Sequence, residues 1–467
     1  MKEMKLRRQL DAPRHSGRIH KRGPGFFEIA TIFILLSSVF LFGAVQPVVL
    51  YGEEFLIFSL FIILMVTRLT RQRPIKTSPL FIPFLVFIAS ILIQLIPLPL
   101  SLLKLISPQA AYLKEVLGQD SALATLSLIP IRTVSQFLRW TSVFLLYLLI
   151  INVFDHRSLS RLLNALFVLT LFEALYGLFL SFTGSKWLLW YHKQEYGNFG
   201  HRVHGTYRNP DHLAGYLEMV IPVHIVQVIS RRFPTPFHFE EKARKMVGIL
   251  LVMVFSLAFF FTISRAGITA FLVGMTYLYF SGKKDDATKF TRYMKVFVAL
   301  IFIYLLWVGM GPIIERFMTS QASLRHGRIL VWQDTLKLVR DFPVFGAGYG
   351  TFQFIFTKYQ HFPSRVVWDY AHNDYLQFLA EGGILGLLSF LWVVARGLLS
   401  LHRKRDIPLA RGVTAGIIAI LIHSFFDFNL QIPANAWIFV TLLAIGWVCK
   451  GEHGDHDRHP LPSAARD

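Results

Sequence analysis

The chain has 467 residues, of which 54% are hydrophobic and only 16% are charged. Soluble domains usually carry about 25% charged residues, so this composition excludes an ordinary soluble protein and is typical of a membrane protein. The net charge of +20 comes from short Lys and Arg clusters between apolar runs, a pattern of topology signals, so we expect no nucleic-acid partner. The single cysteine, Cys449, excludes an internal disulfide framework and a cysteine-based metal site.

The apolar runs predict twelve membrane spans separated by polar loops. The first 25 residues are basic, and the apolar run after them has the length of one span without a small-residue cleavage site behind it, so we interpret it as an uncleaved first helix. In chain order the predicted spans are residues 26–45, 50–67, 79–98, 136–154, 160–182, 212–230, 247–263, 267–281, 296–313, 373–395, 408–426 and 432–449. We therefore expect an all-α polytopic membrane protein, with one helical membrane domain (26–450) between a basic N-terminus (1–25) and a tail (451–467).

The distribution of Lys and Arg predicts which loops face the cytoplasm. With the N-terminus inside, 32 of the 48 Lys and Arg residues fall on that side and 16 on the other, although the loops of the other side are longer. Cytoplasmic loops of membrane proteins carry such an excess of basic residues. Both termini are therefore predicted to be cytoplasmic.

Four segments then face outward. Residues 99–135 are apolar and amphipathic and are expected to lie on the membrane surface, in contact with membrane lipids. Residues 183–211 are rich in aromatic side chains and histidine, and residues 264–266 form a tight turn. The largest outward loop, 314–372, contains a predicted amphipathic helix, RILVWQDTLKLVR, followed by the glycine-rich sequence FGAGYGTF.

The outward segments share a set of histidine and arginine residues: His204, Arg208, Arg265, Arg328 and His372. A single arginine at a span end is explained equally well by a side chain that reaches the lipid headgroups. Several arginines on one face favour another task, because a guanidinium binds phosphate through two parallel hydrogen bonds and keeps its charge. We therefore predict that Arg208, Arg265 and Arg328 bind a lipid-linked pyrophosphate at the outer headgroup level.

His372 lies in DYAHNDYLQFLAEGG, a polar stretch directly before an apolar run. An imidazole accepts a proton at neutral pH, because its ordinary pKa is about 6.5. A sugar hydroxyl that attacks an anomeric carbon must lose its proton as the new bond forms. We therefore predict His372 as a general base, oriented by Asp369, Asp374 or Glu381, although helix capping and solvation explain each of these acids more simply.

Two other features have ordinary explanations. Gly346, Gly348 and Gly350 resemble a phosphate-binding loop only superficially, because no strand precedes them and no Lys-Ser/Thr follows, so we predict a tight re-entrant turn. Glu173 lies inside a predicted span, where a carboxylate is costly and therefore often functional. A protonated side chain or a partner on a neighbouring helix accounts for it as well.

Several motifs together resemble a known family. They are Arg328–Trp332 (RILVW), Asp341–Gly350 (DFPVFGAGYG), Ala371–Leu376 (AHNDYL) and Glu381–Gly386 (EGGILG), with Ser127–Thr133, Gly205–Asp211 and Thr262–Gly267 before them. From about residue 127 to 395 the chain resembles the O-antigen ligases and Wzy-type polymerases. It departs from that pattern in carrying Arg208 and Asp211, where small residues and Asn are more usual, and in having an outer loop that is compact for a ligase.

The resemblance implies a bacterial inner-membrane glycosyltransferase with a GT-C-like helical fold. Such an enzyme takes a glycan from an undecaprenyl pyrophosphate carrier on the periplasmic side and uses neither a metal nor another cofactor. His372 matches the family's proposed base, and Arg265 and Arg328 match its pyrophosphate-binding arginines. We expect the neighbouring polar residues to support these three: His204, Asp369, Asp374, Tyr375 and Glu381.

The sequence does not identify the acceptor of the glycan. Lipid A core (a ligase), another glycan repeat (a polymerase) and a protein all agree with the motifs. A transporter or flippase of lipid-linked glycans is the alternative from another class. It predicts charged residues near the bilayer midplane and two related halves, whereas Glu173 is the one midplane acid found and no internal repeat is visible. A structural scaffold leaves the outward histidines and arginines unexplained.

Overall fold

The computed structural model describes residues 23–118, 122–192, 202–230, 234, 240–282, 324–364 and 366–449. The predicted span 296–313, most of the predicted N-terminus and the tail lie outside these residues. A helix lies at each of the other predicted spans: α2 (Phe26–Phe40), α3 (Pro47–Thr70), α4 (Phe81–Ile93), α7 (Pro130–Val153), α8 (Leu159–Thr183), α9 (Pro210–Ile229), α10 (Glu241–Phe261), α11 (Arg265–Phe280), α16 (Asp374–His402), α17 (Pro408–His423) and α18 (Pro433–Val448).

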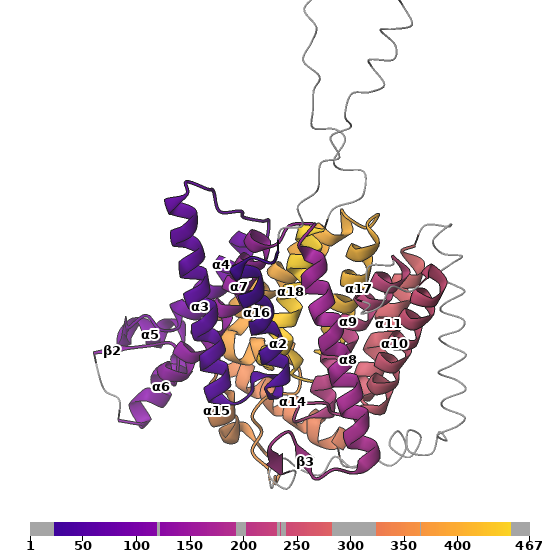
Figure 1. The fold of residues 1–467 in the computed structure, drawn as a ribbon. Coiled ribbons are helices and arrows are strands. Elements are labelled where there is room, and N and C mark those ends of the chain that lie inside the picture. Colours follow the sequence, from indigo (N-terminus) through magenta and orange to yellow (C-terminus); the bar gives the residue numbers. More distant parts are fainter. Residues whose placement is uncertain are drawn as a thin grey trace, which may run out of the picture.

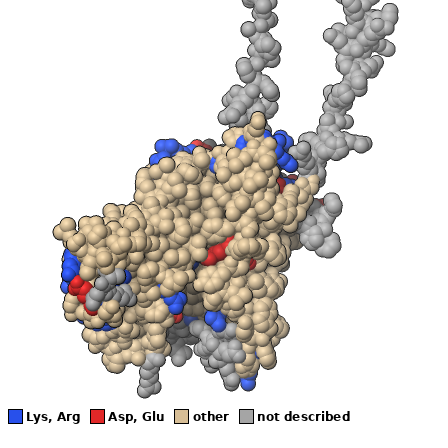
Figure 2. All heavy atoms as spheres, turned by 90° about the vertical axis from the view of Figure 1, so that its left-hand side faces the viewer, with Lys and Arg blue, Asp and Glu red and all other residues tan. Residues whose placement is uncertain are grey.

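The chain is a mostly helical, multi-pass membrane protein. Among the described residues, six helices are long and apolar enough to cross a bilayer, namely α3, α7, α8, α9, α10 and α16, and four shorter apolar helices are α2, α4, α17 and α18. The count of twelve spans stays a prediction. Figure 2 shows one side of the molecule, most of whose surface carries uncharged side chains, which suits a lipid-facing belt.

The sequence of each helix explains its place in the bundle. α18 is apolar on all sides, and its residues from Pro433 to Gly446 are buried, so it lies in the centre. α9 is likewise buried and packs against α10 and α17. α3 instead exposes large apolar residues such as Val48 (85%) and Phe55 (70%), which suit contact with lipid tails.

A smaller layer covers one end of the bundle. At the bottom of Figure 1 lie β3 (Trp187–Leu188) with its partner β4 (Tyr191–His192), and the helices α14 (Leu324–Asp341) and α15 (Phe352–Tyr359). α5 (Leu100–Ile106) and α6 (Pro108–Val116) project to the left, next to the short ladder of β1 (Leu98–Pro99) and β2 (Leu123–Ala124). The predicted amphipathic helix in the outer loop is confirmed by α14.

The glycine-rich sequence forms a tight turn against α16. The backbone N–H groups of Ala347 and Gly348 donate to the carbonyls of Ala380 and Glu381, each at 3.0 Å. A Cβ on Gly346, whose φ is +72°, would lie 2.2 Å from the Glu381 carbonyl oxygen, so only glycine fits. These N–H groups are used within the protein, which agrees with the predicted re-entrant turn and not with a phosphate cradle.

Candidate active site

His372 sits at the end of the outer layer, two residues before the first residue of α16. Its φ is +49°, a left-handed conformation that is uncommon for residues other than glycine and that occurs preferentially at functional sites. The backbone is fixed on both sides of it. The Trp332 indole N–H donates to the Ala371 carbonyl at 3.0 Å, and the Asn373 side chain caps α16 by accepting from the Leu376 N–H at 3.0 Å.

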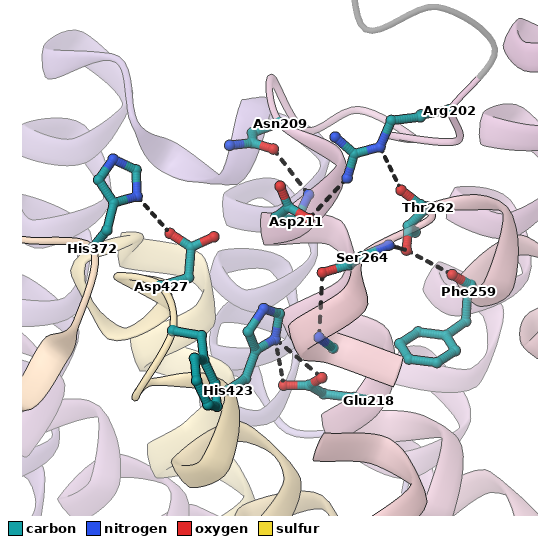
Figure 3. A network of polar contacts seen from close by, with 12 residues as sticks. Arg202, Asn209, Asp211, Glu218, Phe259, Thr262, Ser264, His372, His423 and Asp427 are labelled. Atoms are coloured by element: carbon teal, nitrogen blue, oxygen red, sulfur yellow. Dashed lines mark hydrogen bonds and ion pairs between the residues drawn. The ribbon is translucent and has the colours of Figure 1, made fainter. Parts of the chain in front are cut away.

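The imidazole of His372 faces a carboxylate that is distant in the sequence. Its Nδ1 lies 3.2 Å from Oδ1 of Asp427, which is 2% exposed and lies in the turn between α17 and the short 3-10 helix η3 (Asn429–Gln431) (Figure 3). Arg328 reaches the same turn from α14. Its Nη2 is 3.8 Å from Asp427 Oδ2, and its Nη1 donates to the Phe426 carbonyl at 2.7 Å. Two of the predicted residues, His372 and Arg328, therefore both contact the carboxylate of Asp427.

Asp427 keeps its negative charge in this setting. Burial would raise the pKa of its carboxyl group, but the Arg328 guanidinium and the His372 ring beside it lower the pKa well below its usual range. A neutral His372 then places its proton on Nδ1 and donates it to Asp427, since the carboxylate accepts only. Nε2 is left with a lone pair, and in Figure 3 that nitrogen points away from Asp427.

Asp374 and Tyr375 hold the turn that carries Asp427. Asp374 is fully buried, and its Oδ2 accepts from the Leu430 N–H at 3.0 Å. The Tyr375 hydroxyl donates to the Leu421 carbonyl, at the end of α17, at 2.8 Å. Both predicted supporting residues thus act on the turn and make no described hydrogen bond to His372.

Of the other two predicted acids, Asp369 lies near His372 and Glu381 does not. Burial raises the pKa of the Asp369 carboxyl group, and the neighbouring His372 lowers it, so the two residues interact electrostatically. Glu381 lies under the glycine-rich turn, where its Oε1 accepts from the Phe352 N–H at 2.9 Å. Its role there is to hold the turn, and the structure does not bring it to His372.

The turn before α9 and the turn before α11 are held together by hydrogen bonds, beside the turn that carries Asp427. The buried Arg202 donates from Nε to the Thr262 carbonyl at 2.6 Å, and its Nη2 contacts Asp211 Oδ1 at 2.8 Å (Figure 3). Asn209 caps α9 by accepting from the Asp211 N–H at 2.9 Å, and Ser264 caps α11. The family-like segments at 205–211 and 262–267 are therefore joined through a residue outside both of them.

The predicted arginines lie on these joined turns. Arg208 stands before the α9 cap and Arg265 is the first residue of α11, and both are half-buried. Asp211 interacts electrostatically with Arg328 and with Asp427, which connects the two turns to the His372 group. His204 is buried, and its Nδ1 lies 3.0 Å from the Tyr207 carbonyl, so it holds its own turn.

Glu173 anchors the same region from within the bundle. Its carboxylate accepts from the N–H of Thr206 at 2.9 Å and from its hydroxyl at 2.8 Å. Gly205, with φ +56°, allows this approach, because a Cβ there would lie 2.3 Å from Glu173 Oε2. The costly buried acid is thereby explained by a partner, and it positions the turn that carries Arg208.

Sequence reasoning missed Asp427, Arg202 and a second buried pair, in which His423 Nδ1 lies 3.0 Å from Glu218 Oε1 (Figure 3). A signal for Asp427 existed. The predicted spans 408–426 and 432–449 leave residues 427–431 between them on the same side as His372, so this turn should have been counted as outward. Arg202 carries no comparable signal, whereas Glu218 lies inside the predicted span 212–230, where a carboxylate is as costly as at Glu173. Within the described part of the chain, no three His, Cys, Asp or Glu residues are placed to hold a metal ion.

Residues 249–391 match the model of a protein family described as O-Antigen ligase. The matched range includes Arg265, Arg328 and His372, whereas Arg202 and Asp427 lie outside it. No curated protein matches the chain. The predicted resemblance to this family is therefore confirmed, over a shorter range than the predicted 127–395.

Proposed function

Because residues 249–391 match the model of the O-antigen ligase family, we propose that the chain is a glycosyltransferase that moves a glycan from undecaprenyl pyrophosphate to an acceptor on the periplasmic face of the bacterial inner membrane. The observation that carries this proposal is the group formed by His372, Asp427 and Arg328. It combines a proton acceptor with a phosphate-binding cation at the end of the bundle where the outer layer lies.

His372 acts as the general base. Asp427 accepts the Nδ1 proton and leaves Nε2 to take the proton of the acceptor hydroxyl. As that proton leaves, the hydroxyl oxygen forms a bond to the anomeric carbon of the donor, and the bond from this carbon to the phosphate oxygen breaks. The imidazolium that forms is stabilised by the carboxylate of Asp427, which stays ionised.

The arginines stabilise the leaving group. Undecaprenyl pyrophosphate leaves as an anion, and its charge grows as the glycosidic bond breaks. Arg328, Arg265 and Arg208 supply cationic groups from three segments at this end of the bundle, where a pyrophosphate at headgroup level would lie. Arg202 is committed to Asp211 and Thr262 and acts by holding two of these segments together.

The test uses purified protein and a lipid-linked glycan donor. Removal of a general base usually lowers the rate about 10²- to 10⁴-fold. We expect His372→Ala to bind the donor nearly as well as the wild type and to transfer its glycan at least about a hundredfold more slowly. A variant that loses donor binding but keeps its turnover per bound donor would instead assign His372 to substrate binding.

A further inference from the structure

A second group of polar side chains, buried except for the half-buried Gln136, lies where α2, α3 and α7 pack together. We call Glu53, Glu54, Gln136 and Arg139 the α3–α7 cluster. The exposed fractions are 4% for Glu53, 4% for Glu54 and 3% for Arg139, although these helices are otherwise apolar. Charged groups in a membrane bundle are costly and mark functional sites more often than structural ones.

Each member of the cluster has a polar atom that its neighbours leave without a hydrogen bond. Among the described residues, Oε2 of Glu53, Oε1 of Glu54, Oε1 of Gln136 and Nε of Arg139 are buried and have no partner. Glu54 interacts electrostatically with Arg139, but the two residues form no described ion pair. Four such atoms on the packed helices α3 and α7, with Gln136 one turn before Arg139, indicate that a polar ligand completes the site.

The cluster contacts the back of the candidate active site. Arg139 Nη2 donates to the Leu430 carbonyl at 3.0 Å, and the Leu430 N–H donates to Asp374. Leu430 follows Asp427 by three residues, and Asp374 follows His372 by two. Arg139 also interacts electrostatically with Tyr370. The cluster therefore adjoins both segments that hold the His372–Asp427 pair.

The cluster and the arginine-bearing turns belong to helices at opposite sides of the bundle. α3 and α7 are on the left of Figure 1, whereas α9 and α11 are on the right. Two carboxyl groups and an amide with a single guanidinium disfavour a pyrophosphate, but they suit a ligand that offers several hydroxyl groups. Such a ligand donates to carboxyl and amide oxygens and accepts from Arg139.

We propose that the α3–α7 cluster is the subsite that binds the sugar hydroxyl groups of the acceptor glycan. This inference rests on the proposed function, and it places the acceptor on the α3 side of His372 and the donor pyrophosphate on the α9 side. The acceptor sugar is either part of lipid A core or the end of another lipid-linked glycan, and both present the same hydroxyl chemistry.

The test compares Glu54→Gln and Gln136→Leu with the matched control Glu28→Gln. Glu28 is an acid on the neighbouring α2 that pairs with Arg161 far from the cluster. Transfer is measured from a lipid-linked donor to purified lipid A core and, separately, to a second lipid-linked glycan. For the acceptor that the wild type uses, we expect the acceptor KM to rise about 10- to 100-fold in both cluster variants. The donor KM and kcat should stay within about twofold, and Glu28→Gln should behave as the wild type.

Other outcomes overturn the assignment. A raised donor KM with an unchanged acceptor KM would make the cluster a donor site, and inserted variants with both constants unchanged would make it structural. If the variants do not insert, a photoreactive side chain at Tyr51, which is 50% exposed one turn before Glu54, replaces them. Crosslinking to the acceptor supports the proposal, and crosslinking to the donor alone or to neither substrate refutes it. A wild type that transfers the glycan to neither of these acceptors, nor to a protein, would refute the proposed function itself.

Discussion

Replacing Asp427 with Asn tests the carboxylate behind His372 directly. Asn keeps the size of the side chain but removes its charge, and its amide is able to donate to Nδ1 of the ring. Nε2 would then carry the proton, which is the wrong tautomer for a base. The variant therefore loses both the selection of the tautomer and the attraction to the imidazolium that forms during transfer.

The distance gives the size of the effect. At 3.2 Å and an effective dielectric constant of about 20, the carboxylate and an imidazolium attract each other by about 5 kcal/mol. The His372 side chain is 23% exposed, so water reduces this figure, and we take about 3 kcal/mol. That energy corresponds to a rate about a hundredfold lower.

The assay is single-turnover transfer at saturating donor, with donor binding measured separately. We expect Asp427→Asn to slow transfer about a hundredfold while it binds the donor nearly normally. The matched control is Asp369→Asn, because Asp369 interacts with His372 electrostatically and makes no described hydrogen bond to it. Its effect should be clearly smaller.

A double variant decides whether the two residues act as a unit. Asp427→Asn should slow the His372→Ala enzyme little further, because a residue that acts through the base has no effect once the base is gone. A full hundredfold loss in the His372→Ala background would show that Asp427 works independently, and a wild-type rate in Asp427→Asn would refute the reasoning altogether.

Three further predictions concern the arginines, the turn and pH. Arg328→Lys and Arg265→Lys should insert normally into the membrane but transfer the glycan poorly, because lysine keeps the charge but cannot form two parallel hydrogen bonds to a phosphate. Full activity in both variants would show that the two arginines only anchor the helices at the membrane interface. Gly346→Ala should lower the free energy of unfolding by about 1–3 kcal/mol, measured as thermal stability in detergent, whereas Gly52→Ala, where a Cβ meets nothing within 4 Å, should not. The lowered pKa of Asp427 adds stability that is present above about pH 4, the ordinary pKa of an aspartate, and is lost as the pH falls below it. The stability advantage of the wild type over Asp427→Asn should therefore shrink on acidification, and an advantage that grows would contradict the pairing.

The predicted topology has its own measurement. Reporter fusions after residues 200 and 350 should read periplasmic, and fusions after 240 and 405 should read cytoplasmic, because of the excess of Lys and Arg on the cytoplasmic side. A cytoplasmic reading at 350 would place His372 in the wrong compartment and remove the basis of the proposed function.

The sequence by itself determined the helices and the main candidates. A run of apolar residues is a local property that the bilayer demands, so helices appear at the predicted places, although their ends differ; α7, for example, begins at Pro130 and not at 136. His372, Arg265 and Arg328 could be singled out because their chemistry and their motifs lie within short stretches. The tight turn at Gly346, Gly348 and Gly350 could be predicted because no strand precedes these glycines and no Lys-Ser/Thr follows them.

Only the tertiary structure decided what these residues contact. Asp427 is 55 residues from His372 and about 100 from Arg328, and no periodicity connects such positions. The same holds for Thr206 against Glu173 and for Arg139 against Leu430, which come together when α8 packs against α9 and α7 against α18. The local sequence pattern determines which backbone conformation a segment prefers. The partner of a buried charge depends instead on which helices pack side by side, and this packing is a property of the whole fold.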